Sequence, residues 1–356
     1  MPKQTKMLKV HPKDNVLVAL TNLQKGDLIE CANDLICLKD NVKAKHKLVT
    51  HDLAIGAEIF MYGVVVGRAK KKILKGEAIN THNITHETEE YFVPEKNIQH
   101  DWNPPDTYKF LNHTFLGYHR EDGKVGTENN WLVIPLVFCQ NRNIEEIKKV
   151  MLESLGYLNV HKQTFDIQSL IDAYKYGKSE DDLLDMDILY NAKEKKNDRL
   201  FTNVDGVKFL THEGGCGGST SDAVTLCNLL AGYINNPNVA GATVLSLGCQ
   251  HAQISILERA LKRIASDIKK PVFFLEQHNS SSERNFIAES IKKTFIGMIE
   301  ANKVSRSPAP LSKLTIGLEC GGSDGFSGIS ANPTLGYVSD IVVGLGGSAV
   351  LSEFPE

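Results

Sequence analysis

The run Trp131-Leu132-Val133-Ile134-Pro135-Leu136-Val137-Phe138 is a short apolar stretch that ends directly before Cys139. A continuous apolar run of this length, rich in branched residues, is typical of an interior strand of a parallel sheet. Three further runs have the same character and end at or shortly before a cysteine: residues 207–213, 242–248 and 313–318. In open α/β sheets, ligands bind outside the carboxyl ends of the strands. The sequence therefore predicts an α/β fold whose strand ends carry the functional residues.

Four cysteines share this placement: Cys139, Cys216, Cys249 and Cys320. Because the carboxyl ends of parallel strands meet at one edge of a sheet, we expect the four thiols to converge on one crevice. The alternative is that each is a small buried apolar residue, as free cysteines often are. The repeated placement favours a site. The remaining cysteines are interpreted as packing residues: Cys31, Cys37 and Cys227.

The stretch from Gly317 to Pro333 is rich in glycine around Cys320 and contains Ser323, Asp324 and Asn332. Clustered glycine indicates turns with positive φ or close approach of a ligand to backbone N–H groups. A tight surface turn is the alternative.

The pattern of apolar, polar and glycine residues changes along the chain. Residues 1–86 hold short strands broken by glycine, which predicts a small β module. Residues 87–109 are polar and acidic and are interpreted as a linker. Residues 110–356 alternate strands with amphipathic helices, which predicts a Rossmann-like α/β domain with a largely parallel sheet and right-handed crossovers. The expected helices are residues 144–155, 221–233, 253–268 and 281–301, and the charged segment 174–197 is expected to be a solvated helix and loop.

Composition restricts the function classes. The formal net charge of −3 over 356 residues gives no basic stripe, so nucleic acid is not an expected partner. No apolar run of about 18 residues and no signal peptide is visible, which predicts a cytoplasmic protein without a membrane partner. The seven cysteines are an odd number without the spacing of a disulfide scaffold, so we expect reduced thiols.

The chain resembles the altronate dehydratase family, which also contains galactarate dehydratases and sulfolactate sulfo-lyases. The segment 320–333 is close to a signature of that family. Further matches are Gly117-Tyr118, Arg120, Asp122-Gly123, Val125-Gly126, Gly206-Val207, His212, Gly215-Cys216, Pro237-Asn238 and Leu247-Gly248-Cys249. The N-terminal part resembles the SAF (β-clip) module of these enzymes through Asp14-Asn15-Val16, His46-Lys47, Asp52-Leu53-Ala54, Tyr62-Gly63 and Thr81-His82-Asn83.

The resemblance implies a metal-dependent hydro-lyase that dehydrates a sugar acid, first of all D-altronate to 2-dehydro-3-deoxy-D-gluconate in hexuronate breakdown. Galactarate dehydration and sulfolactate desulfonation are the nearest alternatives. The implied cofactor is Fe²⁺, with Mn²⁺ second. Thiolate and imidazole donors suit iron or zinc better than magnesium or calcium. A metal bound to the substrate carboxylate and 2-hydroxyl would stabilise the enediolate. An iron–sulfur cluster is less favoured, because the cysteines are not closely spaced.

The residues expected to act fall into three groups. The proposed catalytic residues are His212, Cys216 and Asp324. The proposed metal ligands are Cys139, His212, Cys216, Cys249 and Cys320. The proposed substrate-binding residues are His46, Lys47, His82, Asn83, Arg120, Asn129, Ser323 and Asn332. Each has a plainer alternative: a hydrogen-bonded histidine at a strand end, a helix N-cap for Ser323 or Asp324, and a surface position for the residues of the β module. The expected partner is a small sugar acid, and a homodimer is the expected assembly.

The chain departs from the family pattern at three places, and two of them, Glu128 and the end of the chain, favour an alternative function. Glu128 stands where relatives usually have a basic residue, and Gln250 stands where they commonly have Glu. The chain ends at Glu356, within a region that relatives continue, so the C-terminal part of the family is expected to be missing. The alternative is a sugar-acid-binding paralogue or subunit without catalytic activity.

Overall fold

The computed structural model describes residues 6–31, 34–87, 102–157, 163–191, 199–265, 269–319, 321 and 325–352. Contacts divide the chain into two units. Unit 1 combines residues 1–111 with residues 314–356, and unit 2 is residues 112–313. The segment 314–352 thus groups with the N-terminal part of the chain rather than with the large parallel sheet. The sequence-based boundaries at 86 and 110 stay predictions, since most of the expected linker lies outside the described residues.

Unit 1 begins with the β module (residues 6–87), which confirms the prediction of a small β-rich module. Its strands are β1 (Met7–Leu8), β2 (Val16–Ala19), β3 (Leu28–Cys31), β4 (Asp34–Cys37), β5 (Lys47–Val49), β6 (Glu58–Met61), β7 (Val64–Ala69) and β8 (Ile84–His86). They form antiparallel sheets in the orders β1-β2-β5, β3-β4 and β6-β7-β8. Two apolar clusters form the interior, one around Leu48 and one around Ile59.

The C-terminal part of unit 1 is a βαβ segment. It consists of β18 (Thr315–Leu318), the short 3-10 helix η5 (Ser327–Ile329), α7 (Ala331–Gly344) and β19 (Ser348–Leu351). The strand predicted before Cys320 is confirmed as β18. Its described partner is β19, to which it is parallel, and it does not belong to the four-stranded sheet of unit 2. The expectation that all four cysteine-bearing strand ends share one sheet is therefore wrong for the fourth.

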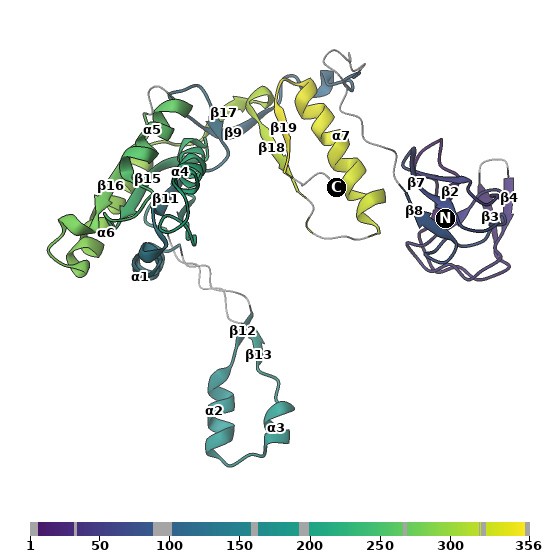
Figure 1. Ribbon diagram of the computed structural model, residues 1–356, viewed down its shortest axis with the longest axis horizontal. Helices are drawn as coiled ribbons and strands as arrows, with labels where there is room; N and C mark the ends of the chain where they lie inside the picture. The colour runs from purple at the N-terminus through teal and green to yellow at the C-terminus, as the bar shows by residue number, and fades with distance from the viewer. Residues whose placement is uncertain are drawn as a thin grey trace. The chain divides into compact units, whose positions relative to one another are not determined.

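Unit 2 contains a four-stranded parallel sheet in the order β14-β11-β15-β16 (Figure 1). The strands are β11 (Asn130–Pro135), β14 (Gly206–Phe209), β15 (Val239–Ser246) and β16 (Val272–Glu276). They alternate with helices α1 (Asn141–Ser154), α4 (Thr220–Asn235), α5 (Ile254–Ile264) and α6 (Glu283–Ala301). The predicted Rossmann-like α/β arrangement is confirmed, and the four expected helices are present with boundaries shifted by a few residues.

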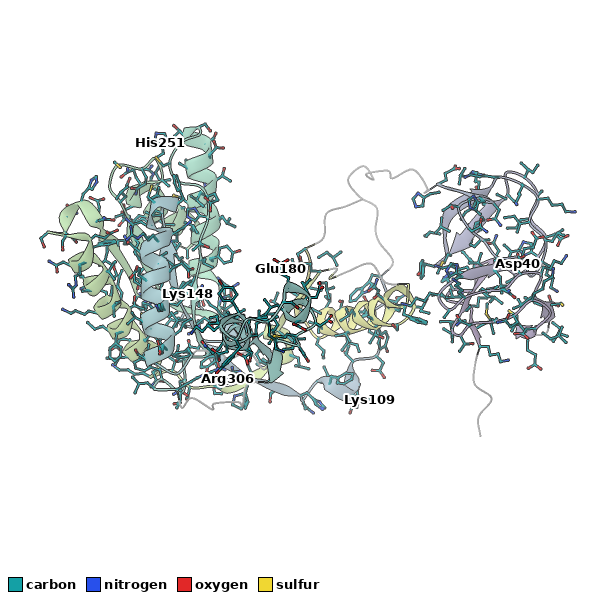
Figure 2. All side chains as sticks on the ribbon, turned by 90° about the horizontal axis from the view of Figure 1, so that it is seen from below. Asp40, Lys109, Lys148, Glu180, His251 and Arg306 are labelled. Carbon is teal, nitrogen blue, oxygen red and sulfur yellow. The ribbon has the colours of Figure 1, made fainter. Side chains whose placement is uncertain are left out.

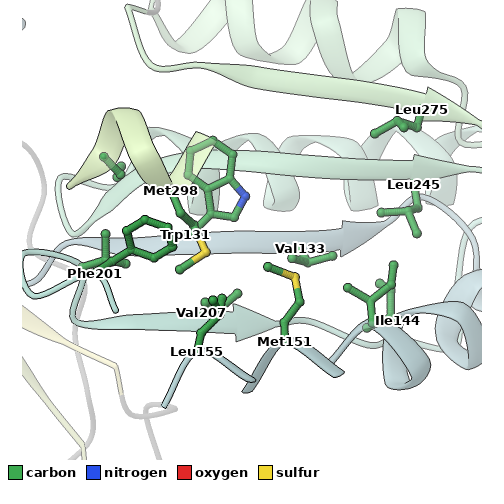
Figure 3. Packing of buried hydrophobic residues seen from close by; sticks show 14 of the residues in the cluster. Trp131, Val133, Ile144, Met151, Leu155, Phe201, Val207, Leu245, Leu275 and Met298 are labelled. Atoms are coloured by element: carbon green, nitrogen blue, oxygen red, sulfur yellow. The ribbon is translucent and has the colours of Figure 1, made fainter. Parts of the chain in front are cut away.

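The central strands are buried along their whole length, because helices cover both faces of the sheet. Every residue of β11 and β15 is buried. Helices α1 and α6 pack on one face, and α4 and α5 pack on the other. Trp131 lies in the middle of the first face among apolar side chains (Figure 3). Its indole Nε1 donates a hydrogen bond to Thr243 Oγ1 at 3.1 Å, so the one polar atom of the ring is satisfied inside the core.

Smaller elements complete unit 2. Strands β9 (Thr114–His119), β10 (Val125–Gly126) and β17 (Ser307–Pro310) form an antiparallel sheet. A second group consists of β12 (Gln163–Phe165), α2 (Ile167–Lys175), α3 (Glu180–Leu184) and β13 (Leu189–Asn191). Helix α3 confirms the helix expected in the charged segment, and Ser179 and Asp182 form a capping box at its start. Among the described helices none has the length and apolarity needed to cross a bilayer.

Close packing of α6 on the sheet depends on Gly297. A Cβ atom at Gly297 would overlap Trp131 Cη2 and would lie 2.7 Å from Cζ3 of the same ring. We expect Gly297→Ala to lower the free energy of unfolding by about 1–3 kcal/mol, because the core must shift to admit the methyl group. Gly232→Ala in α4 is the matched control, since no atom lies within 4 Å of a Cβ there. Helix propensity should make this control neutral or stabilising by up to about 1 kcal/mol. Urea unfolding measures both changes, and equal effects would contradict the packing argument.

Candidate active site

The strand order creates a topological switch point beside β11. Helix α1 leads from β11 to β14 on one side, and α4 leads back across to β15 on the other side. In open α/β sheets the crevice at such a point, outside the carboxyl ends of the two strands, is the usual ligand site. The loops that follow β11 and β15 carry Cys139 and Cys249. Two of the sequence-predicted residues therefore flank the expected crevice.

The loop after β14 crosses this point and joins the other two loops. Gly214 O accepts a hydrogen bond from Phe138 N, and Gly215 O accepts hydrogen bonds from His251 N and Ala252 N, at 3.0 to 3.1 Å. Gly215 has φ +96°, and a Cβ there would overlap Leu136 O. Only glycine fits both the conformation and the space. The crossing places the adjacent Cys216 beside the loops of Cys139 and Cys249.

The three described thiols of this edge are all exposed: Cys139, Cys216 and Cys249. Cys227 is fully buried against the sheet, and burial raises the pKa of its thiol to about 11, so its interpretation as a packing residue is confirmed. Cys31 is partly buried against the core of the β module. Cys37 is exposed, which makes the packing interpretation wrong at that position.

His212 is held by backbone groups on both sides of its ring. Gly214 N donates to Nδ1 at 3.1 Å, so the ring proton belongs to Nε2, which donates to Pro135 O at 2.8 Å. Neither nitrogen is free in this conformation. The geometry corresponds to the alternative of a hydrogen-bonded histidine at a strand end, and a metal-ligand or acid/base role would require one ring nitrogen to give up its present partner.

A set of buried amides stiffens the same edge. Gln250 is almost fully buried; its Oε1 accepts from Gly248 N at 2.7 Å, and its Nε2 donates to Ser246 Oγ and to Ala252 O. Gln140, in the segment after β11, donates from Nε2 to Gln277 Oε1 at 2.6 Å. This hydrogen bond joins the loop after β11 to the loop after β16, although β15 lies between these two strands in the sheet. The loops at the carboxyl edge are therefore fixed by hydrogen bonds rather than by apolar packing alone.

Two histidines at this edge were missed by the sequence reasoning. His251 and His278 are exposed, and His251 N is bonded to Gly215 O beside Cys216. His278 lies directly against Gly248, where a Cβ would be 2.7 Å from its Nδ1. The signal was available, because the strand-end rule that singled out the cysteines also applies to β16 and to the residues that follow it.

Arg120 and Asn129 lie at the opposite edge of the sheet. Figure 2 shows His251 and Arg306 at two opposite ends of unit 2. Arg306 forms an ion pair with Asp205, and Asp205 accepts a hydrogen bond from Asn129 N at 2.8 Å. These contacts place Asn129 at the same end of unit 2 as Arg306. Arg120 Nε donates to Pro237 O, and its Nη2 donates to Asn129 Oδ1. The Asn129 amide also donates to two backbone carbonyls, so it offers no group to a substrate here.

Glu128 is also at this opposite edge. Its Oε2 accepts from Asn130 Nδ2 at 2.6 Å. The carboxylate is therefore engaged at the start of β11, a whole strand length away from the carboxyl ends, and the expectation that it opposes an anionic substrate there loses its structural basis.

The other predicted substrate-binding residues lie in unit 1. His46 and His82 are exposed, and Lys47 is half-buried in β5. Asn83 is buried, and its amide accepts from Asn80 N and donates to Ala78 O, which is a turn-stabilising role. Asn332 is exposed in the first turn of α7. The predicted residues Cys320, Ser323 and Asp324 lie outside the described residues, so their roles stay predictions.

The described donors match iron in chemistry but not in arrangement. Thiolate and imidazole groups are suitable ligands, and Asn141 Oδ1 at the same edge is buried without a hydrogen-bond partner. Within the described ranges, however, no three His, Cys, Asp or Glu side chains come together as a metal site. A metal ion needs several ligands at about 2.0–2.4 Å. The described residues alone therefore do not fit the metal.

A pocket of about 250 Å³ lies at the opposite edge, lined by Arg120, Asp122 and Lys270 among others. Lys270 Nζ donates to the carbonyl oxygens of Ile234 and Asn236 at the end of α4. Burial, followed by the charge of Arg120, lowers the pKa of Lys270 to about 7. These contacts assign Lys270 to capping α4 rather than to the chemistry at the carboxyl edge.

A small β module and an α/β unit whose parallel sheet carries exposed thiols on the loops at its carboxyl edge define an α/β protein with the usual ligand position of open sheets at that edge. Family models identify it further. The second domain of D-galactarate dehydratase/altronate hydrolase matches residues 117–302, the altronate/galactarate dehydratase SAF domain matches residues 5–87, and the C-terminal domain of D-galactarate/altronate dehydratase matches residues 311–356. The chain belongs to the D-galactarate dehydratase/altronate hydrolase family, as its resemblance predicted.

Individual relatives agree with this assignment. The chain is 32% identical over 350 residues to altronate dehydratase of Bacillus subtilis (strain 168), covering 98% of this chain and 60% of that protein. It is 28% identical over 349 residues to altronate dehydratase of Escherichia coli (strain K12), with 98% and 60% covered. It is 27% identical over 362 residues to galactarate dehydratase (L-threo-forming) of the same organism, with 98% and 59% covered. The chain thus spans about 60% of the length of these curated relatives.

The loop crossing at the switch point is testable by a pair of glycine substitutions. Gly215→Ala places a methyl group against Leu136 O and 2.7 Å from Val137 Cα, so we expect the three loops to separate. Gly217→Ala is the control, because Gly217 also has positive φ, +76°, but has no atom within 4 Å of a Cβ. Urea unfolding and the labelling rates of Cys139, Cys216 and Cys249 measure the result. If the two substitutions change stability and labelling rates equally, the positive φ alone would account for the effect, and the close contact of Gly215 with Leu136 O would not be needed.

Lys270 predicts a pH dependence of stability. Its pKa is lowered from 10.5 to about 7 in the folded state, so between these values the unfolded chain holds a proton that the folded chain has released. The free energy of unfolding should therefore rise with pH in this window, by at most about 1.4 kcal/mol per pH unit from this group. We expect Lys270→Gln to remove that slope, and Lys262→Gln, an exposed change on α5, to retain it. Urea unfolding measured at several pH values between about 7 and 10.5 gives the slope of the free energy of unfolding for each variant. Identical slopes in the two variants would contradict the lowered pKa of Lys270.

Proposed function

We propose that this chain carries the site of a hydro-lyase that dehydrates a sugar acid, with D-altronate as the first substrate and 2-dehydro-3-deoxy-D-gluconate as the product. The observation that carries the proposal is the crossing of Gly214 and Gly215 over the switch point, which gathers the loops of three exposed cysteines in a chain of this family. Relatives named altronate dehydratase support the substrate, and galactarate and sulfolactate are the alternatives.

The reaction sets clear demands on the site. The C2–H bond, next to the carboxylate, breaks by transfer of its proton to a base, and the electron pair forms the C2=C3 double bond. The hydroxyl on C3 leaves with a proton as water, and the resulting enol becomes the 2-keto acid. The α proton is weakly acidic, so a site must stabilise the enediolate charge as well as hold a base.

The residues of the carboxyl edge provide groups for this work. His251 is our preferred proton carrier, because its backbone is anchored to Gly215 O while its ring is exposed beside the loop of Cys216. His212 is assigned to holding this loop, through Pro135 O and Gly214 N. Iron(II) remains the proposed cofactor, with manganese(II) second, because thiolate and imidazole donors suit these metals. Its ligands would have to include Cys320 or other residues outside those described.

A second candidate function is that of a sugar-acid-binding subunit that is not active alone. One relative, 24% identical over 243 residues, is named (2R)-sulfolactate sulfo-lyase subunit beta. The residue-level support from Glu128 is weak, because its carboxylate is bonded to Asn130 at the other edge of the sheet.

The test combines metal analysis with turnover. Chain purified without oxygen and loaded with Fe²⁺ is assayed with D-altronate, galactarate and (2R)-sulfolactate. We expect turnover of altronate, and we expect Cys216→Ser and Cys249→Ser to lower bound iron and turnover by about tenfold or more. Cys37→Ser is the control, since Cys37 is an exposed thiol of the β module.

The outcomes separate the two candidates. Binding of a sugar acid without turnover would favour the subunit. Neither binding nor turnover by the folded, iron-loaded chain would overturn both.

A further inference from the structure

In the described part of the chain, two residues other than glycine have a left-handed φ: Lys45 at 73° and Tyr62 at 60°. Both belong to the β module. Tyr62 and Gly63 form the two-residue turn between β6 and β7, where Met61 pairs with Val64. Turns with positive φ at both positions normally use Asn, Asp or Gly. A bulky residue in this conformation is unfavourable and persists where surrounding contacts hold it, often at functional positions.

Both residues contact the same short segment of the glycine-rich stretch, residues 325–329. The Lys45 ammonium lies 4.9 Å from the centre of the Phe326 ring, and a Cβ at Gly325 would be 3.0 Å from Lys45 Cβ. Tyr62 Oη lies so close to Gly328 that a Cβ there would overlap it. Glycine at 325 and 328 is therefore what lets the segment approach the two left-handed residues.

An apolar anchor accompanies these contacts. Ile329 packs against the cluster of the β module that contains Val16, Val49 and Ile59. The segment thus touches the module in three ways: a cation–π contact, two close glycine approaches, and an aliphatic side chain added to an apolar core. Helix α7 begins two residues further on, at Ala331. Docking of this segment therefore fixes the start of α7 as well.

We propose that the β module is a docking platform for residues 325–329 and that Lys45 and Tyr62 are its two positioning residues. The module then acts on the glycine-rich stretch between β18 and α7, rather than forming an independent appendage. The consequence for activity rests on the proposed function: if that stretch contributes to the dehydratase site, loosening the dock lowers turnover.

A double-mutant cycle tests the contact directly. Gly328→Ala places a methyl group on Tyr62 Oη, and Tyr62→Phe removes that oxygen. Hydrogen exchange in the full chain measures the protection of residues 325–330. We expect Gly328→Ala to speed exchange there by about tenfold or more and the double variant to regain much of the protection. Gly336→Ala is the control, because in α7 a Cβ at Gly336 meets no atom within 4 Å.

The outcomes are distinct. Rescue by Tyr62→Phe supports the dock, since a general loss of stability would not be reversed by removing one oxygen. Equal exchange of residues 325–330 in all variants overturns it. If Gly328→Ala does not fold, Lys45→Met decides, because loss of the cation–π contact should speed exchange in 325–330, and unchanged exchange overturns the dock. Turnover of D-altronate is measured on the same variants. If the unmodified chain shows no turnover, the result counts against the proposed function, but the hydrogen-exchange rates still test the docking of residues 325–329.

Discussion

The parallel pairing of β11 with β15 is the constraint on which unit 2 depends. Each residue of both strands is buried, so each strand needs a helix layer on both of its faces. Chain connectivity then requires a helix to lead out to β14 and another to return across β11. That return produces the switch point, and it brings the loop of Gly214 and Gly215 over the end of β11. The position of the candidate site follows from the burial of two strands.

Much of this could be predicted from the sequence. The branched apolar runs predicted the strands, and helical periodicity predicted α1, α4, α5 and α6. The strand-end rule placed Cys139, Cys216 and Cys249 on loops at one edge of the sheet, which is where they lie. These inferences succeed because they rest on local patterns whose period is set by the backbone itself.

The failures concern which elements become neighbours. The strand before Cys320 has the pattern of the other three, yet it pairs with β19 in unit 1, since a pattern specifies burial but not the partner strand. Arg120 and Asn129 precede β11, and it is the direction of the strand that places them at the opposite edge from the cysteines. His212 was singled out by its position, whereas its hydrogen bonds to Pro135 O and Gly214 N depend on how two loops cross.

The amide of Gln250 has a consequence for the loop after β15. A side-chain amide can accept from Gly248 N and donate to Ser246 Oγ and Ala252 O at the same time, whereas a carboxylate has no donor and a carboxylic acid has only one. The side chain that holds this loop therefore stays uncharged whatever the acidity. The exposed rings of His251 and His278 therefore stand on loops that are held by neutral hydrogen bonds.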